Sequence, residues 1–503
     1  MNIIKLNALD GTQIEFDKDS QAGCGAMKDV YFSPDKSYVV GFFRKPQDNN
    51  SRERLQTIVT NYKKMLFENE GGKNIESLFC WPTHIVEYND GNKVKIGVVC
   101  PTYDKKFFFA SGKFKGKEQE GKWFASAKLR NKFLESDVKG NWLNYLQVCI
   151  KIARAVKRLH AAGLAHSDLS YKNILINPLS GDACIIDIDG LVVPGKFPPD
   201  VVGTPDFIAP EVLETMELEK NDKNKKLPQR STDQHALAVL IYMYLLYRHP
   251  LRGGMVCDPS DSDNDEKLLM GKEALFIEHP TNNKNRPLLS SLSKDELPQG
   301  NIDLLPYTLV GPYLKELFDR AFIKGLHNPR ERPTADEWER ALIKTVDLIQ
   351  PCPNPKCEAK FFVFDNTKYP KCPFCGTSYE KTLPVLNFYY KPRSKGNFMN
   401  ENIRLMVFEQ QSLYKWHIDR NIFPNEKIKD CDRKPVGDFH FIKGKWWLVN
   451  RNIEKLVDVT TEPHVEILKK QKVELTEGRK LLFSNNGNLR LAIVQMANDK
   501  KRK

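Results

Sequence analysis

The sequence predicts an α+β chain in which a strand-rich segment precedes a helical one, and a final β domain follows a small cysteine-rich unit. Alternating and β-branched residues characterise residues 1–102, whereas helical periodicity dominates residues 141–349. Four clustered cysteines follow residue 350, and β patterns return from residue 383. We therefore expect three parts, which are residues 1–349, 350–380 and 383–503.

Composition and charge indicate a globular protein with acidic partners. The 503 residues are 41% hydrophobic and 28% charged, and the formal net charge is +13. Nucleotide phosphates would satisfy such a charge as well as nucleic acid would, and nucleic acid is the less favoured partner of the two. The longest apolar stretch (235–247) is too short to span a bilayer, and no secretory signal is evident. Most of the cysteines are scattered singly, so we expect a cytoplasmic protein with reduced thiols.

Residues 1–102 predict a small sheet with one helix. The segments 36–44 and 93–100 are rich in β-branched and aromatic residues. Between them, residues 51–67 show helical periodicity with a capping Ser or Asn at the start. Residues 103–140 are basic and irregular.

Helices are expected from residue 141 onward. Residues 141–160 and 231–248 carry apolar side chains at three- and four-residue spacing. A capped helical pattern spans residues 331–349. Between these helices, the segment 252–304 is rich in Asp, Ser, Asn and Lys, which predicts a long surface insertion.

A short polar loop between a predicted helix and an apolar strand carries Asp168, Lys172 and Asn173. A carboxylate can orient a hydroxyl group and accept its proton. An amide oxygen can bind a hard cation, and a lysine can neutralise charge on a transferring phosphoryl group. The strand that follows offers a second carboxylate, Asp187 or Asp189, for a magnesium site.

The order of these residues resembles the catalytic core of the protein-kinase superfamily. The pattern H-x-D-x4-N is formed by His166, Asp168 and Asn173. The sequence Asp-Ile-Asp-Gly begins at Asp187, where kinases carry D-F-G. The segment GTPDFIAPE (203–211) matches the kinase pattern G-T-x-x-[FY]-x-A-P-E.

Two further positions extend the resemblance. Asp233 falls where kinases carry a helix aspartate that braces the catalytic loop, and Arg332 falls where an arginine pairs with the glutamate of A-P-E, here Glu211. The resemblance implies a bilobal protein-kinase-like fold, with an N-lobe over about residues 1–102 and a C-lobe over about residues 103–349.

The resemblance also implies roles for the loop residues. Asp168 would be the catalytic base or hydroxyl orienter, and Asn173 and Asp187 would hold Mg²⁺. Lys172 would lie near the γ-phosphate of ATP, although it stands four residues after the acid and kinases of this type usually carry the lysine two residues after it. Thr204 matches a threonine typical of Ser/Thr kinases and favours Ser/Thr substrates.

The glycine-rich loop that covers the ATP phosphates in kinases is only partly matched. Gly23, Gly25 and Val30 fit G-x-G-x-x-G-x-V, but Lys28 replaces the third glycine. Glycines allow backbone N–H groups to approach phosphate, and a lysine at this position could add a direct charge. Adenine is expected beside the hinge, at Cys100 and Thr102.

The lysine that anchors the ATP phosphates has three candidates. Arg44 is the cation in phase with the buried face of the predicted strand, and Lys45 lies at about the usual distance from the glycine loop. Lys28 could instead reach in from the loop itself. The glutamate that would pair with this cation is also undecided, because the candidate Glu53 lies near the start of the predicted helix.

Four cysteines predict a structural zinc site. Cys352, Cys357, Cys372 and Cys375 form two close pairs, and the turn CPFCG resembles a zinc-ribbon knuckle. Four cysteine ligands leave no open coordination position, so the metal would have a structural role. A ribbon of about 30 residues cannot build its own core, so zinc would supply the folding energy.

Residues 383–503 predict a β-sandwich whose last strands resemble those of forkhead-associated domains. The kinase-like core, ribbon and β domain together resemble bacterial protein kinases linked to tellurite-resistance-type gene clusters. That resemblance implies two partners besides the protein substrate, namely a von Willebrand factor A-type protein and a metal-dependent Ser/Thr phosphatase.

The sequence therefore favours an ATP- and Mg²⁺-dependent Ser/Thr protein kinase in bacterial stress or defence signalling. Two alternatives stay open, a nucleotide-binding pseudokinase scaffold and a nucleic-acid-binding adaptor that uses the zinc ribbon. Many kinases switched by phosphorylation carry an arginine before the catalytic acid, but this position is Ser167. The segment 188–203 contains no Ser, Thr or Tyr, so we expect no activating phosphorylation there.

Overall fold

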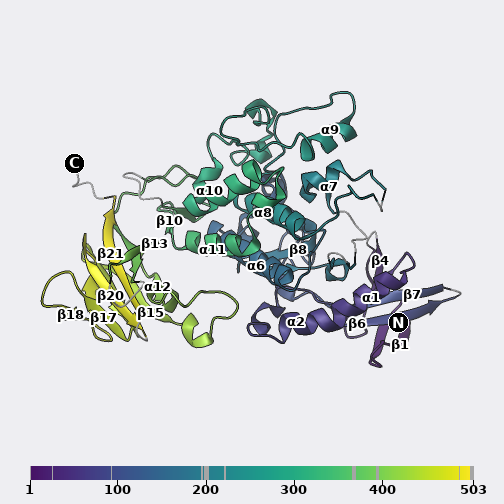
Figure 1. Cartoon of the computed structure of the whole chain (residues 1–503), viewed down its shortest axis with the longest axis horizontal. Coiled ribbons are helices and arrows are strands. Elements are labelled where there is room, and N and C mark those ends of the chain that lie inside the picture. The colour runs from purple at the N-terminus through teal and green to yellow at the C-terminus, as the bar shows by residue number, and fades with distance from the viewer. Residues whose placement is uncertain are drawn as a thin grey trace. The chain divides into compact units, whose positions relative to one another are not determined.

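The structure is a computed structural model that describes residues 2–24, 27–91, 93–193, 196–197, 203–219, 222–364, 370–391, 396–485 and 488–498. The chain folds into two compact units, each made of segments that are not contiguous in sequence. Figure 1 labels the helices and strands. The first unit consists of Met1–Lys139, Gln147–Asn301 and Phe318–Glu337. The second consists of Gly140–Leu146, Ile302–Leu317 and Trp338–Lys503. Within the described ranges, none of the helices combines the length and the apolar character needed to cross a bilayer.

A five-stranded antiparallel sheet forms the N-terminal part of the first unit, in the order β3-β4-β5-β7-β6. Its strands are β3 (Gln21–Cys24), β4 (Lys28–Phe32), β5 (Tyr38–Phe43), β6 (His84–Asp90) and β7 (Lys93–Pro101). A hairpin of β1 (Ile3–Asn7) and β2 (Gln13–Asp17) precedes the sheet. Phe16 of this hairpin lies with Phe42 and Val86 in one buried apolar cluster, which joins the hairpin to the sheet.

The helix expected over residues 51–67 is present and begins at Asn49. It consists of α1 (Asn49–Thr57), a π-helical turn (Ile58–Tyr62) and α2 (Lys63–Phe67), and a short α3 (Lys73–Glu76) follows. The N-cap is Asp48 rather than the expected Ser or Asn, because its side chain accepts a 2.8 Å hydrogen bond from the backbone N–H of Ser51.

Two long helices dominate the rest of the first unit. They are α6 (Trp142–Ala161), whose first turn belongs to the second unit, and α8 (Arg230–Leu246). Almost every side chain of α8 is buried, which agrees with its apolar sequence. Shorter elements surround them, namely α4 (Lys122–Ala125), α5 (Ala127–Phe133), β8 (Ile174–Asn177), β9 (Asp182–Ile185), α7 (Pro210–Glu214) and α9 (Ser262–Met270).

The expectation that residues 252–304 form a surface insertion is wrong in part. Met270, Phe276 and Ile277 of this segment are buried, with Phe276 fully enclosed. The Phe276 ring packs edge-on against Tyr242 of α8, with 5.8 Å between the ring centroids. The few apolar residues of the segment anchor its polar runs to the core, although its average composition is that of a loop.

Two large antiparallel sheets lie in the described part of the second unit. The six-stranded sheet has the order β13-β12-β21-β20-β17-β18, and the four-stranded sheet has the order β14-β15-β16-β19. Their strands are β12 (Leu383–Tyr390), β13 (Met399–Met406), β14 (Ser412–Tyr414), β15 (Pro435–Ile442), β16 (Lys445–Asn450), β17 (Lys455–Asp458), β18 (Val465–Glu466), β19 (Lys472–Glu474), β20 (Lys480–Asn485) and β21 (Asn488–Ala497).

Helices and a small hairpin complete the second unit. The elements are α10 (Pro312–Asp319), α11 (Ala335–Val346), β10 (Ile349–Pro351), β11 (Phe361–Val363) and α12 (Lys415–Ile418), with α10 and α11 each crossing a boundary between the units. The segments 350–380 and 383–503 belong to the same compact unit. A separate zinc ribbon and a forkhead-associated-like sandwich therefore stay predictions.

Candidate active site

The loop that carries Asp168 brings together the polar side chains expected to act together. The Oγ1 hydroxyl of Thr204 donates a 2.8 Å hydrogen bond to Oδ1 of Asp168. The Nδ2 group of Asn173 donates a 2.9 Å hydrogen bond to Oδ2 of Asp168 and a 2.8 Å hydrogen bond to the backbone carbonyl of Asp168. Both carboxylate oxygens of Asp168 are thus oriented, and the side chain is only partly buried.

Asp233 at the start of α8 holds this loop, as the sequence predicts. Its carboxylate accepts hydrogen bonds from the backbone N–H groups of His166 (2.7 Å) and Ser167 (3.2 Å), and the ring of His160 lies 3.1 Å away. Ser167 has a φ of 66°, a left-handed conformation that L-residues adopt at a cost. The buried Asp233 compensates for this strain by binding both neighbouring N–H groups.

The predicted pair of Arg332 and Glu211 is present, with Arg332 buried and Glu211 partly buried. The guanidinium of Arg332 donates 2.8 and 2.7 Å hydrogen bonds to the two carboxylate oxygens of Glu211. It also donates to the carbonyls of Ser231, Gly325 and Leu326, so its charge is fully hydrogen-bonded. This pair anchors the segment 203–211 that presents Thr204 to Asp168.

Lys28 reaches the acids that follow β9. Its Nζ lies 2.8 and 2.7 Å from the two carboxylate oxygens of Asp189 and 3.1 Å from Oδ1 of Asp187. Burial alone would lower the pKa of Lys28, but the charges of Asp189 and Asp187 outweigh it and raise the pKa above its usual value. Conversely, although burial raises the pKa of Asp187, the nearby Lys28 charge lowers it overall. Lys28 and Asp187 are therefore both charged at neutral pH.

The other two candidate cations lie elsewhere. Arg44 donates hydrogen bonds of 3.0 Å (Nε) and 2.8 Å (Nη2) to Asp29 on the neighbouring strand β4. Lys45 is exposed after the end of β5. The structure thus separates three positions that the sequence left equivalent, and Lys28 is the one in contact with the motif acids.

Most of the remaining predicted nucleotide-site residues lie on the five-stranded sheet or next to it. Gly23 and Val30 face each other across the β3–β4 pairing, whereas Gly25 lies outside the described residues. Cys100 packs against a small apolar cluster, where its contact with Cys80 and its burial raise the pKa of its thiol. Thr102 donates a 3.1 Å hydrogen bond to the carbonyl of Ser37. Lys172 is exposed on the short turn between Asp168 and Asn173.

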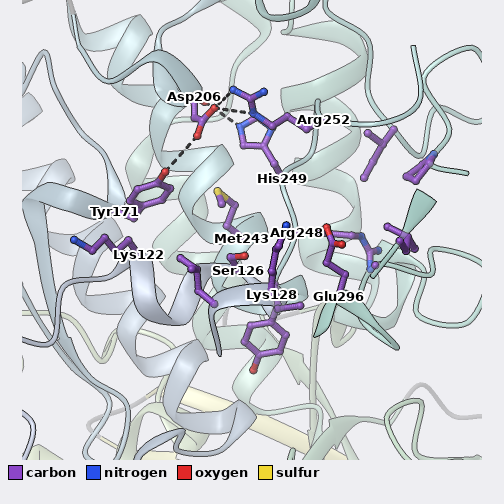
Figure 2. Close-up of a pocket in the computed structure, with 17 residues that line it drawn as sticks. Lys122, Ser126, Lys128, Tyr171, Asp206, Met243, Arg248, His249, Arg252 and Glu296 are labelled. Atoms are coloured by element: carbon purple, nitrogen blue, oxygen red, sulfur yellow. Dashed lines mark hydrogen bonds and ion pairs between the residues drawn. The ribbon is translucent and has the colours of Figure 1, made fainter. Parts of the chain in front are cut away.

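A cavity of about 310 Å³ lies beside this loop (Figure 2). The carboxylate of Asp206, two residues after Thr204, accepts hydrogen bonds from Tyr171 (3.3 Å) and from Nε of Arg252 (2.8 Å). Burial lowers the pKa of His249 to about 4, so its ring is neutral at pH 7. Nε2 of this ring lies 2.9 Å from the carbonyl oxygen of Asp206. Sequence reasoning missed this cavity, because its lining residues are scattered between positions 122 and 300.

The four predicted zinc ligands converge. The sulfur atoms of Cys352, Cys357, Cys372 and Cys375 all lie within 4.8 Å of one another. Sγ of Cys352 is 3.5 Å from that of Cys375, and Sγ of Cys357 is 3.9 Å from that of Cys372. Four thiols at such spacing suit a tetrahedral metal site, and zinc is the ion that four cysteines hold most commonly.

Replacing a buried cysteine of this cluster should remove the metal. Cys372 is fully buried, so Cys372→Ser is expected to lower bound zinc from about one ion per chain to nearly none and to lower the melting temperature. Elemental analysis and differential scanning fluorimetry measure both quantities. Cys431→Ser is the matched control, since this exposed cysteine lies outside the cluster. Unchanged zinc content in Cys372→Ser would contradict the assignment.

The region around this site is similar to known proteins. Residues 124–340 match the protein kinase domain family. Death-associated protein kinase dapk-1 of Caenorhabditis elegans is 34% identical over 107 residues, which are 20% of this chain and 7% of that protein. Serine/threonine-protein kinase PknD of Chlamydia felis is 29% identical over 132 residues, which are 22% and 13% of the two chains.

One solved structure is also similar to this chain. The kinase domain of a rhoptry antigen of Toxoplasma gondii aligns with 68% of this chain and 86% of its own, with a TM-score of 0.41 and 14% identity. The chain spans only a small part of the curated relatives described above, 7% of one and 13% of the other. The region that matches the protein kinase domain family contains Asp168, Asn173 and Asp187, while Lys28 precedes it.

Proposed function

We propose that this protein is an ATP- and Mg²⁺-dependent protein kinase that transfers the γ-phosphate of ATP to Ser or Thr hydroxyls. The observation that carries the proposal is the fixed Asp168 carboxylate, which is oriented by Asn173 and Thr204 on a loop held by Asp233. A carboxylate held in this way can orient an acceptor hydroxyl and take its proton during attack on phosphorus.

The residues around Asp168 fit the remaining requirements of phosphoryl transfer. The Asn173 amide nitrogen donates to Asp168, so its amide oxygen is the atom that could serve as a hard ligand. This oxygen and the half-exposed carboxylate of Asp187 would hold Mg²⁺, which neutralises phosphate charge when bound. The ammonium of Lys28 would contact the ATP phosphates beside them.

The test is transfer of labelled γ-phosphate by the full chain to itself or to a generic protein acceptor. We expect transfer in the presence of Mg²⁺ and its loss when EDTA is added. After acid hydrolysis, the label should be found on phosphoserine or phosphothreonine. ATP binding without any transfer would favour the pseudokinase scaffold. Steep salt-dependent binding to DNA or RNA, again without transfer, would favour the adaptor.

The cellular setting is part of the same proposal. The resemblance to kinases linked to tellurite-resistance-type clusters supports a cytoplasmic role in bacterial stress or defence signalling. It also supports a von Willebrand factor A-type protein and a metal-dependent Ser/Thr phosphatase as partners. Co-purification of the full chain with each of these proteins tests the partnership, and a failure to bind either one would argue against it.

Phosphorylation of Thr204 should inhibit the protein rather than activate it. The Thr204 hydroxyl donates to Oδ1 of Asp168, so a phosphate at Thr204 would place negative charge against the catalytic carboxylate. Thr204→Glu is therefore expected to lose most activity, whereas Thr204→Ser keeps the hydroxyl and most activity. Phosphosite mapping of the active protein is the check. Full occupancy at Thr204, with activity lost on dephosphorylation, would overturn the expectation.

A further inference from the structure

Asp189 is an unusual residue for its position. The third residue of the D-F-G motif is ordinarily glycine, but here a second carboxylate follows Asp187. Asp189 is 5% exposed, in a short helical turn (Ile188–Gly190). Because burial of an unpaired carboxylate is very costly, such a residue needs a partner of opposite charge.

The two carboxylates face different environments. Both oxygens of Asp189 contact Nζ of Lys28, at 2.8 and 2.7 Å, and the Asp189 side chain is 7% exposed. Asp187 offers Lys28 one oxygen at 3.1 Å, and its side chain is 49% exposed. The buried Asp189 thus holds the lysine with both oxygens, while about half of the Asp187 side-chain surface stays available for another ligand.

The acid on the neighbouring helix is engaged elsewhere. Glu53 of α1 is 58% exposed, and its carboxylate lies 3.0 Å from Nζ of Lys196. In protein kinases of the usual pattern, the phosphate-binding lysine pairs with a glutamate on this helix. Here neither the lysine nor its acid is at the usual position, since Lys28 comes from β4 and its partner follows β9.

We propose that Asp189 is the positioning residue that holds Lys28 in the nucleotide site, and that Asp187 is thereby left to bind Mg²⁺. This inference rests on the proposed kinase function. A lysine side chain has four flexible carbons, so a two-oxygen contact in a buried place restricts its ammonium far more than an exposed pair would. The ion pair is complete without any contribution from α1, so movement of this helix would not break it.

A double-mutant cycle tests the proposal on the full chain. The variants are Lys28→Met, Asp189→Asn and the two combined, with the exposed Glu53→Gln as the matched acid control. Two readouts are used, kcat/KM for phosphate transfer and the affinity for a fluorescent ATP analogue in EDTA. The second readout contains no metal, so it does not depend on the ligation of Mg²⁺ by Asp187.

Asp189→Asn is expected to weaken nucleotide affinity about tenfold or more, and Lys28→Met at least as much. The double variant should lose no more than Lys28→Met alone, because Asp189 acts through Lys28. Glu53→Gln should stay within about twofold of the wild type. The proposal would be overturned if the losses of affinity in the two single variants multiply in the double variant. It would also be overturned if Asp189→Asn binds the nucleotide as the wild type does, or if Glu53→Gln loses as much affinity as Lys28→Met.

Two further outcomes distinguish a failure of this inference from unfolding of the variant and from a failure of the kinase proposal. If Asp189→Asn lowers the melting temperature below the assay temperature, Asp189→Glu takes its place in the cycle and is expected to keep part of the affinity. If the wild type transfers no phosphate, the kinase proposal fails. The affinity cycle in EDTA then still decides whether Asp189 positions Lys28 toward a nucleotide.

Discussion

Asparagine in place of Asp168 is expected to reduce kcat for phosphate transfer by about 10²- to 10⁴-fold. The substitution keeps the size of the side chain and one oxygen that can accept from Thr204 or Asn173. It removes the negative charge and the basic oxygen that an attacking hydroxyl requires. KM for ATP should change little, since Asp168 acts on the acceptor rather than on the nucleotide.

Steady-state transfer of labelled phosphate measures this effect, and thermal melting confirms that the variant is folded. Asp263→Asn is the matched control, because this exposed acid lies in the first turn of α9. Transfer by Asp168→Asn at the wild-type rate would remove Asp168 from the proposed mechanism.

Methionine in place of Lys28 is expected to reduce kcat/KM by about 10²- to 10³-fold. The side chain keeps a similar length but loses the charge that meets Asp187 and Asp189. Part of the loss should come from weaker ATP binding and part from the phosphoryl-transfer step. Arg44→Met should have the smaller effect of the two, because Arg44 is paired with Asp29.

Lys95→Met provides the control for Lys28→Met, since Lys95 belongs to the same sheet and pairs with Asp90 instead. Comparison of kcat/KM for these variants ranks the candidate cations directly. A larger loss in Arg44→Met than in Lys28→Met would show that the arginine anchors the phosphates.

The sequence predicts the part of the site that is local or rests on a fixed motif. Asp168 and Asn173 lie on one short loop, and the partners Asp233 and Arg332 occupy motif positions that the structure shows in contact with His166 and Glu211. The cation could not be chosen in this way. Lys28 and Asp189 are 161 residues apart, so their contact depends on how β4 and the end of β9 come together.

Fold predictions succeeded or failed for a similar reason. The apolar helix expected over residues 231–248 appears as α8, because continuous apolar periodicity specifies a buried helix. The prediction of a surface insertion over residues 252–304 is wrong in part, because the average composition of this segment hides a few buried apolar residues such as Phe276. A cavity such as the one beside Asp206 leaves no local pattern, because distant segments supply its walls.

The non-contiguous second unit has a consequence for dissection of this chain. The backbone N–H of Trp142, at the start of α6, donates a 3.0 Å hydrogen bond to the carbonyl of Ala359. The Trp142 ring lies 5.7 Å, centroid to centroid, from the ring of Phe374, which stands in sequence between two of the clustered cysteines. A fragment ending at residue 349 would leave this tryptophan, now 1% exposed, without its cover. Loss of the metal or of the tail should therefore loosen the start of α6 in one cooperative step, which hydrogen exchange at Trp142 would reveal.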